Sequence, residues 1–525
     1  MRGPSLNFPD RFNAAADLLD RNLEEGRGGK VAIRTAAGDH TYQQIATAAN
    51  RAGNALLDLG LEIENRLLMA VLDTPEFVAT FFGAIKCGVV PVPVNPQLKA
   101  HDFAYLLNDS RAKAAVVSEA VAPLIREIRP QLKYLKHLVV IGRAEPGELS
   151  YAELVEAASD QLRPADTGKD DMCFWLYSSG TTGFPKGAVH LQHDMRVSAE
   201  LYAKPILGLG EQDVTLSVAK LYFAYGLGNG AYFALAGGGT TVLHPGPPAP
   251  AAMIDLVRRF RPTLFFAAPT WYANTLAAGS ELWQSADFSS VRHCVSAGEP
   301  LSGSLLERWK LRTGTVILDG IGSTEICHIF ISNRPDDVRP DSTGRIVPGY
   351  EARIVDEEGA DLPDGEIGSL LVKGDSTCAY YWNQHERTKR TFLGEWINTG
   401  DKYLRDPEGY LTYQGRGDDM MKVSGIWVSP TEVESAINSH PAVIECAVVA
   451  TVDENRLLHP QAYVVLRPDF PAGPPIEDQL REHVRVKLAH YKCPRDFHFV
   501  SELPKTATGK IQRYRLREET AGGPA

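Results

Sequence analysis

The sequence lacks any apolar run long enough to cross a membrane, and it lacks an excess of positive charge. Thr, Asp and Glu interrupt each apolar stretch before the roughly 18 residues that a membrane span needs. The net charge of −11 leaves no basic surface of the kind that binds nucleic acid. The N-terminal residues hold no apolar signal core, and the final GGPA matches no peroxisomal or prenylation tag. These absences predict a cytoplasmic protein with no membrane or nucleic-acid partner.

Cysteine is also scarce, and its spacing excludes a disulfide framework. The seven cysteines form no C-x-x-C pair, and an odd number cannot close into a complete set of bridges. We therefore expect reduced thiols that pack in the interior. The 525 residues are too many for one hydrophobic core, so a large domain and at least one smaller domain are expected.

Strand and helix patterns alternate along the N-terminal half. A strand at 67–72, a helix at 76–87 and a strand at 89–94 form a βαβ-like unit, and similar alternation recurs at 105–120 and 137–142. Repeated alternation of this kind favours a mostly parallel sheet.

Further strands end in turns that are candidate walls of one ligand site. Strands at 263–267, 291–296 and 316–318 run into the turns 297–300 and 319–325, and ligands of open α/β sheets bind at strand ends. After these turns, residues 344–416 read as short alternating strands of a β-rich subdomain, and 419–515 has its own strand and helix pattern. Ser429, Pro430 and Glu432 form a helix start.

The predicted fold class is α/β. A large N-terminal domain of α/β sheets with a β-rich subdomain takes residues 1–416, and a small mobile α+β domain takes residues 417–525. The polar junction at 415–419 contains glycine and is suited to hinging.

The stretch Tyr177–Gly187, YSSGTTGFPKG, follows an apolar strand at 173–176 and contains three glycines, four Ser or Thr hydroxyls and one lysine. Such a composition predicts no regular element but a loop whose backbone N–H groups hold the phosphates of a polyphosphate. A surface linker is the alternative. The loop is not a Walker sequence, because Gly187 follows Lys186. A helix is expected at 190–202, and the aromatic, glycine-rich stretch 219–228 looks like a loop.

Six motifs in order resemble those of the adenylate-forming superfamily of acyl-CoA synthetases, adenylation domains and luciferases. They are YSSGTTGFPKG, GIGSTE at 320–325, WINTGD at 396–401, GRGDD at 415–419, KVSG at 422–425 and PKTATGK at 504–510. The resemblance covers nearly the whole chain. AKLYFAYGLGN at 219–229 and GIGSTEICHIF at 320–330 look most like the benzoate-CoA ligase group.

The resemblance implies an ATP-dependent aryl-CoA ligase that uses Mg²⁺ and coenzyme A. A benzoate or substituted benzoate would first give an aryl adenylate and pyrophosphate, and CoA would then displace AMP. An anionic carboxylate must approach an anionic triphosphate, so the site must supply positive charge.

The resemblance assigns ATP contacts to five segments. The residues are Ser178, Ser179, Gly180, Thr181, Thr182, Gly183 and Lys186; Gly298, Glu299 and Pro300; Asp319, Gly320 and Ile321; and Asp401 and Arg416. Thr324 would bind the α-phosphate and Glu325 would hold Mg²⁺. Read alone, the Ser-Thr-Glu triplet could cap a helix, Asp401 and Arg416 could be a surface ion pair, and Glu299 could be an exposed turn residue.

The acid would bind in an aromatic pocket. Its residues are Tyr222, Phe223, Ala224, Tyr225, Gly226, Ala297, Gly322, Ser323, His328 and Ile329. His328 would lie near Glu325 if that segment were helical, and it could bind the carboxylate or a ring substituent; a structural histidine is the alternative. The modest side chains of Ile326 and Cys327 would leave room for a small amino or hydroxyl group. Phe223 stands where many relatives carry a histidine, so no gating role is transferred to it.

The C-terminal domain would carry the catalytic cation. Lys510 resembles the lysine that bridges the carboxylate and the α-phosphate, although a solvated surface lysine is the alternative. The domain would rotate about Asp418 and present Lys422, Ser424 and Gly425 to the CoA tunnel.

Three functions remain open at this point. They are an aryl-CoA ligase, a stand-alone adenylation enzyme that loads a carrier protein, and a non-catalytic nucleotide-binding module. The sequence does not identify the acid, the pathway or the oligomeric state.

Overall fold

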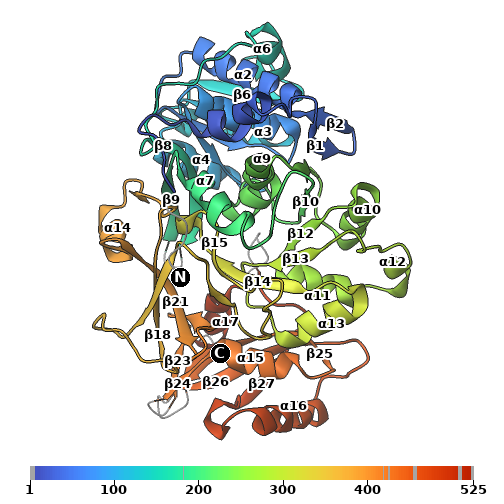
Figure 1. The fold of residues 1–525 in the computed structure, drawn as a ribbon. Helices are drawn as coiled ribbons and strands as arrows, with labels where there is room; N and C mark the ends of the chain where they lie inside the picture. Colours follow the sequence, from blue (N-terminus) through green and yellow to red (C-terminus); the bar gives the residue numbers. More distant parts are fainter. Residues whose placement is uncertain are drawn as a thin grey trace.

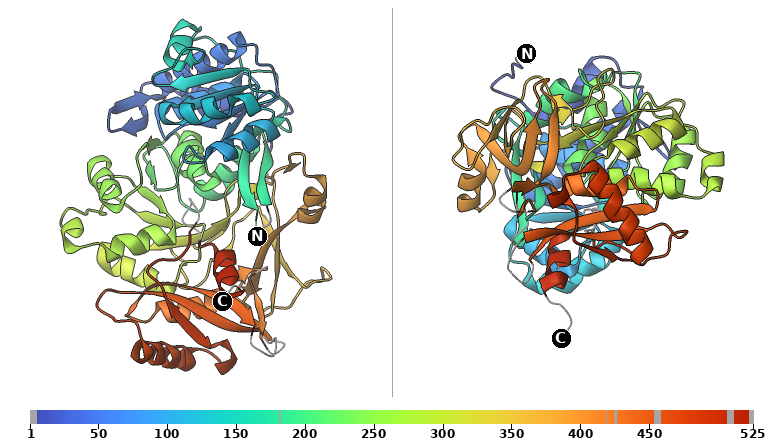
Figure 2. Two further views of the ribbon diagram at one scale, coloured as in Figure 1. Left: turned by 180° about the vertical axis from the view of Figure 1, so that it is seen from behind. Right: turned by 90° about the horizontal axis from the view of Figure 1, so that it is seen from below.

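The computed structural model describes residues 6–180, 183–417, 419–423, 426–452, 458–505 and 511–521. Figure 1 shows the N-terminal elements at one end of the molecule and the C-terminal elements at the other, with the green and yellow elements between them. The two views in Figure 2 show the orange β-rich strands on one side of this middle region and the red C-terminal elements beneath it.

A parallel sheet of five described strands forms the N-terminal end, in the order β4-β3-β5-β6-β7. The strands are β3 (Arg66–Ala70), β4 (Val90–Pro93), β5 (Ala114–Ser118), β6 (His137–Ile141) and β7 (Leu149–Ser150). The helices of this region are α2 (Tyr42–Asp58), α3 (Pro75–Lys86), α4 (Ala100–Asp109), α5 (Ala122–Ile128) and α6 (Tyr151–Ala157). The predicted βαβ unit is confirmed as β3, α3 and β4.

A nine-stranded sheet follows in the described chain, in the order β16-β15-β14-β13-β12-β10-β11-β1-β2. The strands are β1 (Val31–Thr35), β2 (Gly38–Thr41), β10 (Val214–Ser217), β11 (Thr240–Val242), β12 (Leu264–Ala267), β13 (His293–Ser296), β14 (Ile317–Gly322), β15 (Ile329–Ser332) and β16 (Arg345–Ile346). The pairs from β1 through β11, β10, β12 and β13 to β14 are parallel. The three strands predicted at 263–267, 291–296 and 316–318 therefore lie side by side.

The helices around this sheet depart from the predicted pattern at two places. They are α1 (Arg21–Glu24), α7 (Asp194–Ser198), α8 (Ala224–Leu227), α9 (Phe233–Gly237), α10 (Pro250–Phe260), α11 (Pro269–Ala277), α12 (Ser280–Gln284) and α13 (Gly303–Thr313). The helix predicted at 190–202 begins only at Asp194, because His190 belongs to the preceding strand. The stretch predicted as a loop at 219–228 becomes helical at Ala224.

The β-rich subdomain is confirmed. Its strands are β17 (Glu351–Val355), β18 (Ile367–Lys373), β20 (Phe392–Leu393), β21 (Trp396–Arg405) and β22 (Leu411–Arg416), all antiparallel to their partners; helix α14 (His385–Thr391) precedes β20.

The C-terminal elements pack around a core of their own, which includes Met421, Val433 and Val448. The elements are β23 (Met421–Val423), β24 (Ile426–Val428), α15 (Pro430–Asn438), β25 (Val443–Val452), β26 (Leu458–Leu466), α16 (Pro474–Lys487), β27 (Asp496–Phe499) and α17 (Arg513–Ala521). Ser429 caps α15, and its side chain accepts from the Glu432 N–H as the sequence predicts.

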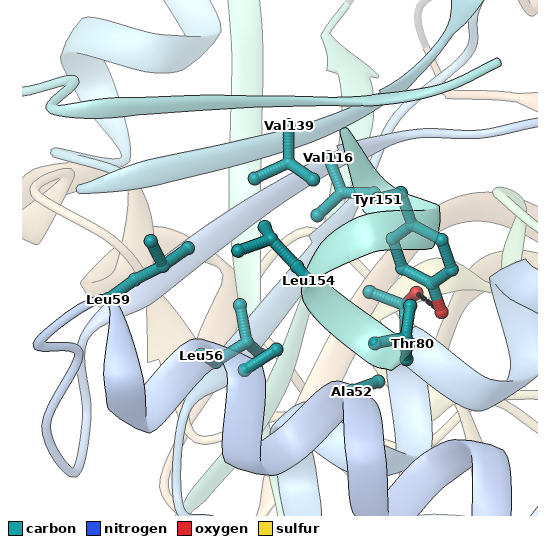
Figure 3. Close-up of a pocket in the computed structure, with 10 residues that line it drawn as sticks. Ala52, Leu56, Leu59, Thr80, Val116, Val139, Tyr151 and Leu154 are labelled. Carbon is teal, nitrogen blue, oxygen red and sulfur yellow. Dashed lines mark hydrogen bonds between the residues drawn. The ribbon is translucent and has the colours of Figure 1, made fainter. Parts of the chain in front are cut away.

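A small cavity lies between α2, α3, α6 and the N-terminal sheet (Figure 3). Its volume is about 20 Å³, and its walls are almost wholly apolar. The Tyr151 hydroxyl closes one side through a hydrogen bond of 3.1 Å with Thr80. A space of this size holds no more than one water molecule, so it is a packing defect and not a substrate pocket.

Candidate active site

The stretch Tyr177–Gly187 forms the end of a β-hairpin. Strand β8 (Met172–Gly180) pairs with β9 (Gly183–Leu191), and Ser178 lies opposite Lys186. The prediction of no regular element is wrong, because strand pairing needs only backbone hydrogen bonds and glycine does not prevent it. The backbones of Ser179, Gly180 and Gly183 lie on the two strands, whereas Thr181 and Thr182 lie outside the described residues.

Side chains outside the hairpin fix its position. The Tyr105 hydroxyl donates to the carbonyl of Pro185 at 2.8 Å, and the Tyr177 hydroxyl donates to Asp109 at 2.6 Å. A third strand, β19 (Tyr380–Tyr381), pairs with β9 and brings the residues after the β-rich strand β18 against the hairpin. The proposed phosphate contacts are therefore held between two regions of the chain.

Lys186 and Glu325 form a largely buried ion pair at this hairpin. The Lys186 Nζ atom lies 2.8 Å from Glu325 Oε1, and the side chains are 14% and 13% exposed. The Tyr381 hydroxyl accepts from Lys186 at 2.6 Å and donates to the same Glu325 oxygen at 2.9 Å. Ser178 adds a fourth contact, because its hydroxyl donates to Glu325 Oε1 at 3.2 Å.

This cluster keeps the Glu325 carboxylate charged. Burial alone would raise its pKa, but the charge of Lys186 and the hydrogen bonds from Lys186 and Tyr381 hold the pKa at about 2. Lys186 also lies over the Tyr381 ring, 4.1 Å from its centroid. The cluster thus places a paired carboxylate and ammonium at the edge of the glycine-rich hairpin.

Glu325 belongs to a tight turn between β14 and β15. A single 3₁₀ turn covers Thr324–Ile326. The next residue, Cys327, has a φ of +71°. The His328 N–H donates to the Ile326 carbonyl, which closes the chain around Cys327. A positive φ in a residue other than glycine is strained and needs support from its surroundings. The turn therefore separates Glu325 from His328, which do not share a helix face.

Three donors from outside hold the carbonyls of this turn. The Thr324 carbonyl lies 2.7 Å from His190 Nε2, the Glu325 carbonyl accepts from the Cys378 N–H at 2.7 Å, and the Ile326 carbonyl accepts from the Ser376 hydroxyl at 2.8 Å. Gly322 is required at the start of the turn, because a Cβ there would lie 2.6 Å from the His328 carbonyl oxygen.

His328 lies among aromatic rings on the other side of the turn. Its ring centroid is 4.4 Å from that of Phe233, 5.5 Å from Tyr225 and 5.6 Å from Tyr202. Burial lowers the pKa of His328 to about 3, so the ring is neutral near pH 7. Its Nε2 atom faces the Asn229 side-chain oxygen at 3.1 Å and the Tyr225 carbonyl at 3.3 Å, both of which accept, so Nε2 carries the proton.

The other predicted acid-pocket residues lie in or next to α8 and near the ends of β13, β14 and β15. Phe223 precedes α8, which contains Ala224, Tyr225 and Gly226; Ala297 follows β13; and Ile329 begins β15. Tyr222 packs edge-on against Phe223, with centroids 4.7 Å apart. Within the described residues, the buried atoms His328 Nδ1 and Ser323 Oγ have no hydrogen-bond partner. Both atoms are thus buried and unsatisfied, and both belong to the segment predicted to bind the acid.

The predicted nucleoside contacts lie on neighbouring strands. An Arg416 guanidinium nitrogen lies 2.9 Å from Asp401 Oδ1, which confirms that the two residues meet. Glu299 accepts from the N–H and hydroxyl of Thr270 at 3.0 and 2.6 Å, and it lies between the exposed residues Gly298 and Pro300. Asp319, Gly320 and Ile321 lie on β14, and burial raises the pKa of Asp319 well above its ordinary value.

Several predicted residues cannot be placed. Lys510, Asp418, Ser424 and Gly425 lie outside the described residues. The backbone of Lys422 lies on β23, which pairs with β24.

Three residues of the site escape prediction from the sequence. Tyr381 lies 56 residues from Glu325 along the chain, and nothing local marks it as a contact. Asn229 orients His328, and Gly228 admits its ring, because a Cβ at Gly228 would lie 2.4 Å from His328 Cδ2. The glycine-rich run after Tyr225 is the one sequence feature that indicates a side chain packed closely against this backbone.

The donor set at Glu325 suits a magnesium ion that travels with phosphate. Among the described residues, no three His, Cys, Asp or Glu side chains are grouped to hold a metal by themselves. Glu325 offers one hard carboxylate, so Mg²⁺ held there would take its other ligands from phosphate and water, as it commonly does.

In the described part of the chain, no helix has the length and apolarity to span a bilayer.

Comparison with protein families decides the membership of the chain. The model of the AMP-binding enzyme matches residues 19–382, and that of the AMP-binding enzyme C-terminal domain matches residues 432–510. The chain belongs to the AMP-binding enzyme family. Among members of this family, the benzoate-CoA ligase of Thauera aromatica is 50% identical over 98% of this chain and 97% of its own.

Two solved structures are similar to this chain over nearly its whole length. An anthranilate CoA ligase in complex with anthranoyl-AMP has a TM-score of 0.94 and 44% identity, covering 98% of both chains. A benzoate CoA ligase from Burkholderia xenovorans has a TM-score of 0.89 and 44% identity, covering 96% of this chain and 100% of its own. The predicted fold class is confirmed, with a large N-terminal and a small C-terminal part.

Proposed function

We propose that this AMP-binding enzyme is an ATP-dependent aryl-CoA ligase that acts through an aryl adenylate. One observation carries the proposal: the turn at residues 322–328 holds Glu325 at the phosphate hairpin and His328 in the aromatic pocket. The two substrates would thus meet along one short segment. The names of the similar enzymes, which ligate benzoate and anthranilate to CoA, support the same reaction.

In the first half-reaction, a carboxylate oxygen of the acid forms a bond to the α-phosphorus of ATP. The bond from that phosphorus to the bridging oxygen breaks, and pyrophosphate leaves. Lys186 and the N–H groups of the hairpin would bind the β- and γ-phosphates, and Thr324 would bind the α-phosphate. Glu325 would hold Mg²⁺, which supplies charge neutralisation to the phosphates. Lys510 would enter from the C-terminal part to bridge the two reacting anions.

In the second half-reaction, the CoA sulfur attacks the acyl carbon of the adenylate. AMP leaves with the electron pair, and the thiol proton passes to solvent. We assign the division at 416/417, with residues 417–525 as a mobile unit that turns about Asp418. These residues have a hydrophobic core of their own, which supports the proposal that they move together. Lys422, Ser424 and Gly425 would line the pantetheine path.

The nucleoside would lie across the ends of β13, β14 and β21. The pair of Asp401 and Arg416 would take the ribose hydroxyls, and residues 298–300 would face the adenine together with Ile321. The aryl ring would rest among Phe223, Ala224 and Tyr225.

The identity of the acid is a finer proposal. His328 is neutral and spends its one N–H on Asn229, so its remaining Nδ1 can only accept. An acceptor in the pocket suits an amino or hydroxyl substituent better than a second carboxylate. We therefore propose benzoate and small amino- or hydroxybenzoates as substrates, with one hydrogen bond giving about 1–3 kcal/mol of discrimination.

The test measures AMP formation with a panel of benzoates and two thiol acceptors. Benzoate with free CoA should release AMP and give benzoyl-CoA, while a phosphopantetheinyl carrier protein should give little. Faster transfer to the carrier would favour the alternative, a stand-alone adenylation enzyme. ATP binding without AMP formation from any acid would overturn the proposal.

A further inference from the structure

A fully buried histidine and aspartate pair stands directly behind the turn that carries Thr324 and Glu325. His190 lies on β9 and Asp194 begins α7, and both side chains are 0% exposed. The His190 Nδ1 atom lies 2.7 Å from Asp194 Oδ2, and its Nε2 atom lies 2.7 Å from the Thr324 carbonyl oxygen. The His190 imidazole thus joins the hairpin of β8 and β9 to the turn that carries Thr324 and Glu325.

The hydrogen-bond partners fix the direction of this contact. A carbonyl oxygen only accepts, so Nε2 must carry a proton and donate it to Thr324. Asp194 faces the opposite nitrogen, and its Oδ2 atom also accepts from the Leu191 N–H at 3.1 Å. A carboxylate in this position accepts from Nδ1–H and orients the ring, so that the two ring nitrogens donate to Asp194 and to the Thr324 carbonyl. The Phe174 ring stacks on His190, with centroids 4.8 Å apart and planes 11° apart, so the imidazole cannot tilt freely.

The turn needs such a support because its backbone is strained. Cys327, two residues after Glu325, has a positive φ. The regular structure of this segment is limited to one 3₁₀ turn at Thr324–Ile326. The carbonyls of Glu325 and Ile326 receive donors from Cys378 and Ser376. The Thr324 carbonyl accepts from the Cys327 N–H within the turn at 3.4 Å, and His190, at 2.7 Å, is the shorter contact that ties it to the rest of the fold.

We infer that His190, oriented by Asp194, is a positioning residue for adenylation. It holds the Thr324–Glu325 peptide at the angle that places the Thr324 hydroxyl and the Glu325 carboxylate toward the triphosphate. This inference rests on the proposed function. Loss of the Nε2 donor should therefore slow adenylate formation, which uses the triphosphate, more than thioester formation. Thioester formation starts from the adenylate, after pyrophosphate has left.

The test compares the two half-reactions in the full-length enzyme. His190→Leu should lower kcat/KM for MgATP in benzoate-dependent pyrophosphate exchange by about 10- to 100-fold, the range for loss of a supporting hydrogen bond behind a metal ligand. Conversion of supplied benzoyl adenylate and CoA to benzoyl-CoA should fall several-fold less. His190→Gln, whose amide can donate to the carbonyl, should recover most of the exchange activity.

The matched control is His101→Gln, at a histidine whose side chain is 82% exposed and whose Nε2 atom also lies near an aspartate, 3.4 Å from Asp102 Oδ1. This variant should change neither half-reaction by more than about twofold. If His190→Leu does not fold, Asp194→Asn supplies the comparison, since it keeps the size of the side chain and removes its orienting charge.

The outcomes separate this inference from the proposed function. A wild-type enzyme without exchange activity overturns the proposed function. An active wild-type enzyme whose His190 and Asp194 variants lose both half-reactions equally, or lose neither, overturns the positioning role alone.

Discussion

The ammonium of Lys186 lies 2.8 Å from the Glu325 carboxylate, so the cation expected to bind phosphate is paired with the anion expected to hold magnesium. MgATP would satisfy both groups at once, because Lys186 would exchange Glu325 for the phosphates and Glu325 would hold the metal. ATP without the metal would leave a buried carboxylate unpaired, which is costly. Nucleotide and metal binding should therefore be strongly coupled.

This coupling predicts an unusual property of Lys186→Met. Removing the ammonium should weaken ATP binding but strengthen Mn²⁺ binding to the nucleotide-free enzyme by about tenfold, equal to about 1.4 kcal/mol, because Glu325 then has no competing cation. Electron paramagnetic resonance of free Mn²⁺ near pH 8 measures this affinity. The double variant Lys186→Met, Glu325→Gln should lose the gain. Unchanged Mn²⁺ binding in the single variant would contradict the exchange.

Tyr381 should act on ATP and not on the acid. Its hydroxyl joins Lys186 to Glu325, so Tyr381→Phe should raise the KM for MgATP by about tenfold, the usual effect of one hydrogen bond to a charged group. The KM for benzoate should stay within about twofold.

Steady-state kinetics with each substrate varied in turn checks this split. Tyr380→Phe is the matched control, since the neighbouring hydroxyl faces the Met172 sulfur at 3.8 Å. Equal effects of the two variants on MgATP would argue against a role for the Tyr381 hydroxyl.

His328 should make the fold sensitive to acid. Its pKa is about 3 in the folded chain and near 6.5 in an unfolded one, so the unfolded state binds the extra proton between these values. The free energy of unfolding therefore falls as pH drops through this window, by up to about 1.4 kcal/mol per pH unit.

Urea unfolding at several pH values between about 6.5 and about 4.5 tests this contribution. His328→Gln should show a shallower loss of stability with falling pH than the wild type. His101→Gln, at a side chain 82% exposed, should follow the wild type. Parallel curves for all three proteins would show that His328 is not held neutral by burial.

Lys510 should matter in only one half-reaction. Ion pairs flank its segment, since Lys505 meets Glu445 at 2.8 Å and Arg513 meets Glu434 at 2.8 Å, and all four residues belong to the C-terminal part. The lysine would therefore move with that part. Lys510→Ala should lose pyrophosphate exchange by about 100-fold or more and still convert supplied benzoyl adenylate to thioester. Loss of both activities to the same extent would remove Lys510 from the adenylation step.

The sequence predicts those parts of the fold that have a local cause. The period of apolar residues at 67–94 is enough to find β3, α3 and β4. The composition of 177–187 misleads, because glycine content suggests a loop while the backbone pairs as β8 and β9. Likewise, the apolar residues after His190 suggest a helix from that position, yet His190 completes the strand and Asp194 begins the helix.

Contacts across the site depend on the tertiary fold and leave no local trace. Motifs predict Lys186 and Glu325 separately, but not that they pair through Tyr381 on a third strand. The turn at Cys327 defeats the expectation that Glu325 and His328 lie on one helical face, because a single positive φ changes the direction of the chain. Spacing alone cannot reveal such a turn.

In the proposed reaction, the enzyme joins the acid to AMP before any thiol takes part. Exchange of labelled pyrophosphate into ATP, measured with Mg²⁺ and benzoate but without CoA, is the decisive measurement of this order. We expect exchange that requires benzoate and is lost in Lys186→Met. Absence of exchange with every benzoate tried, or release of ADP and phosphate in place of AMP and pyrophosphate, would contradict it.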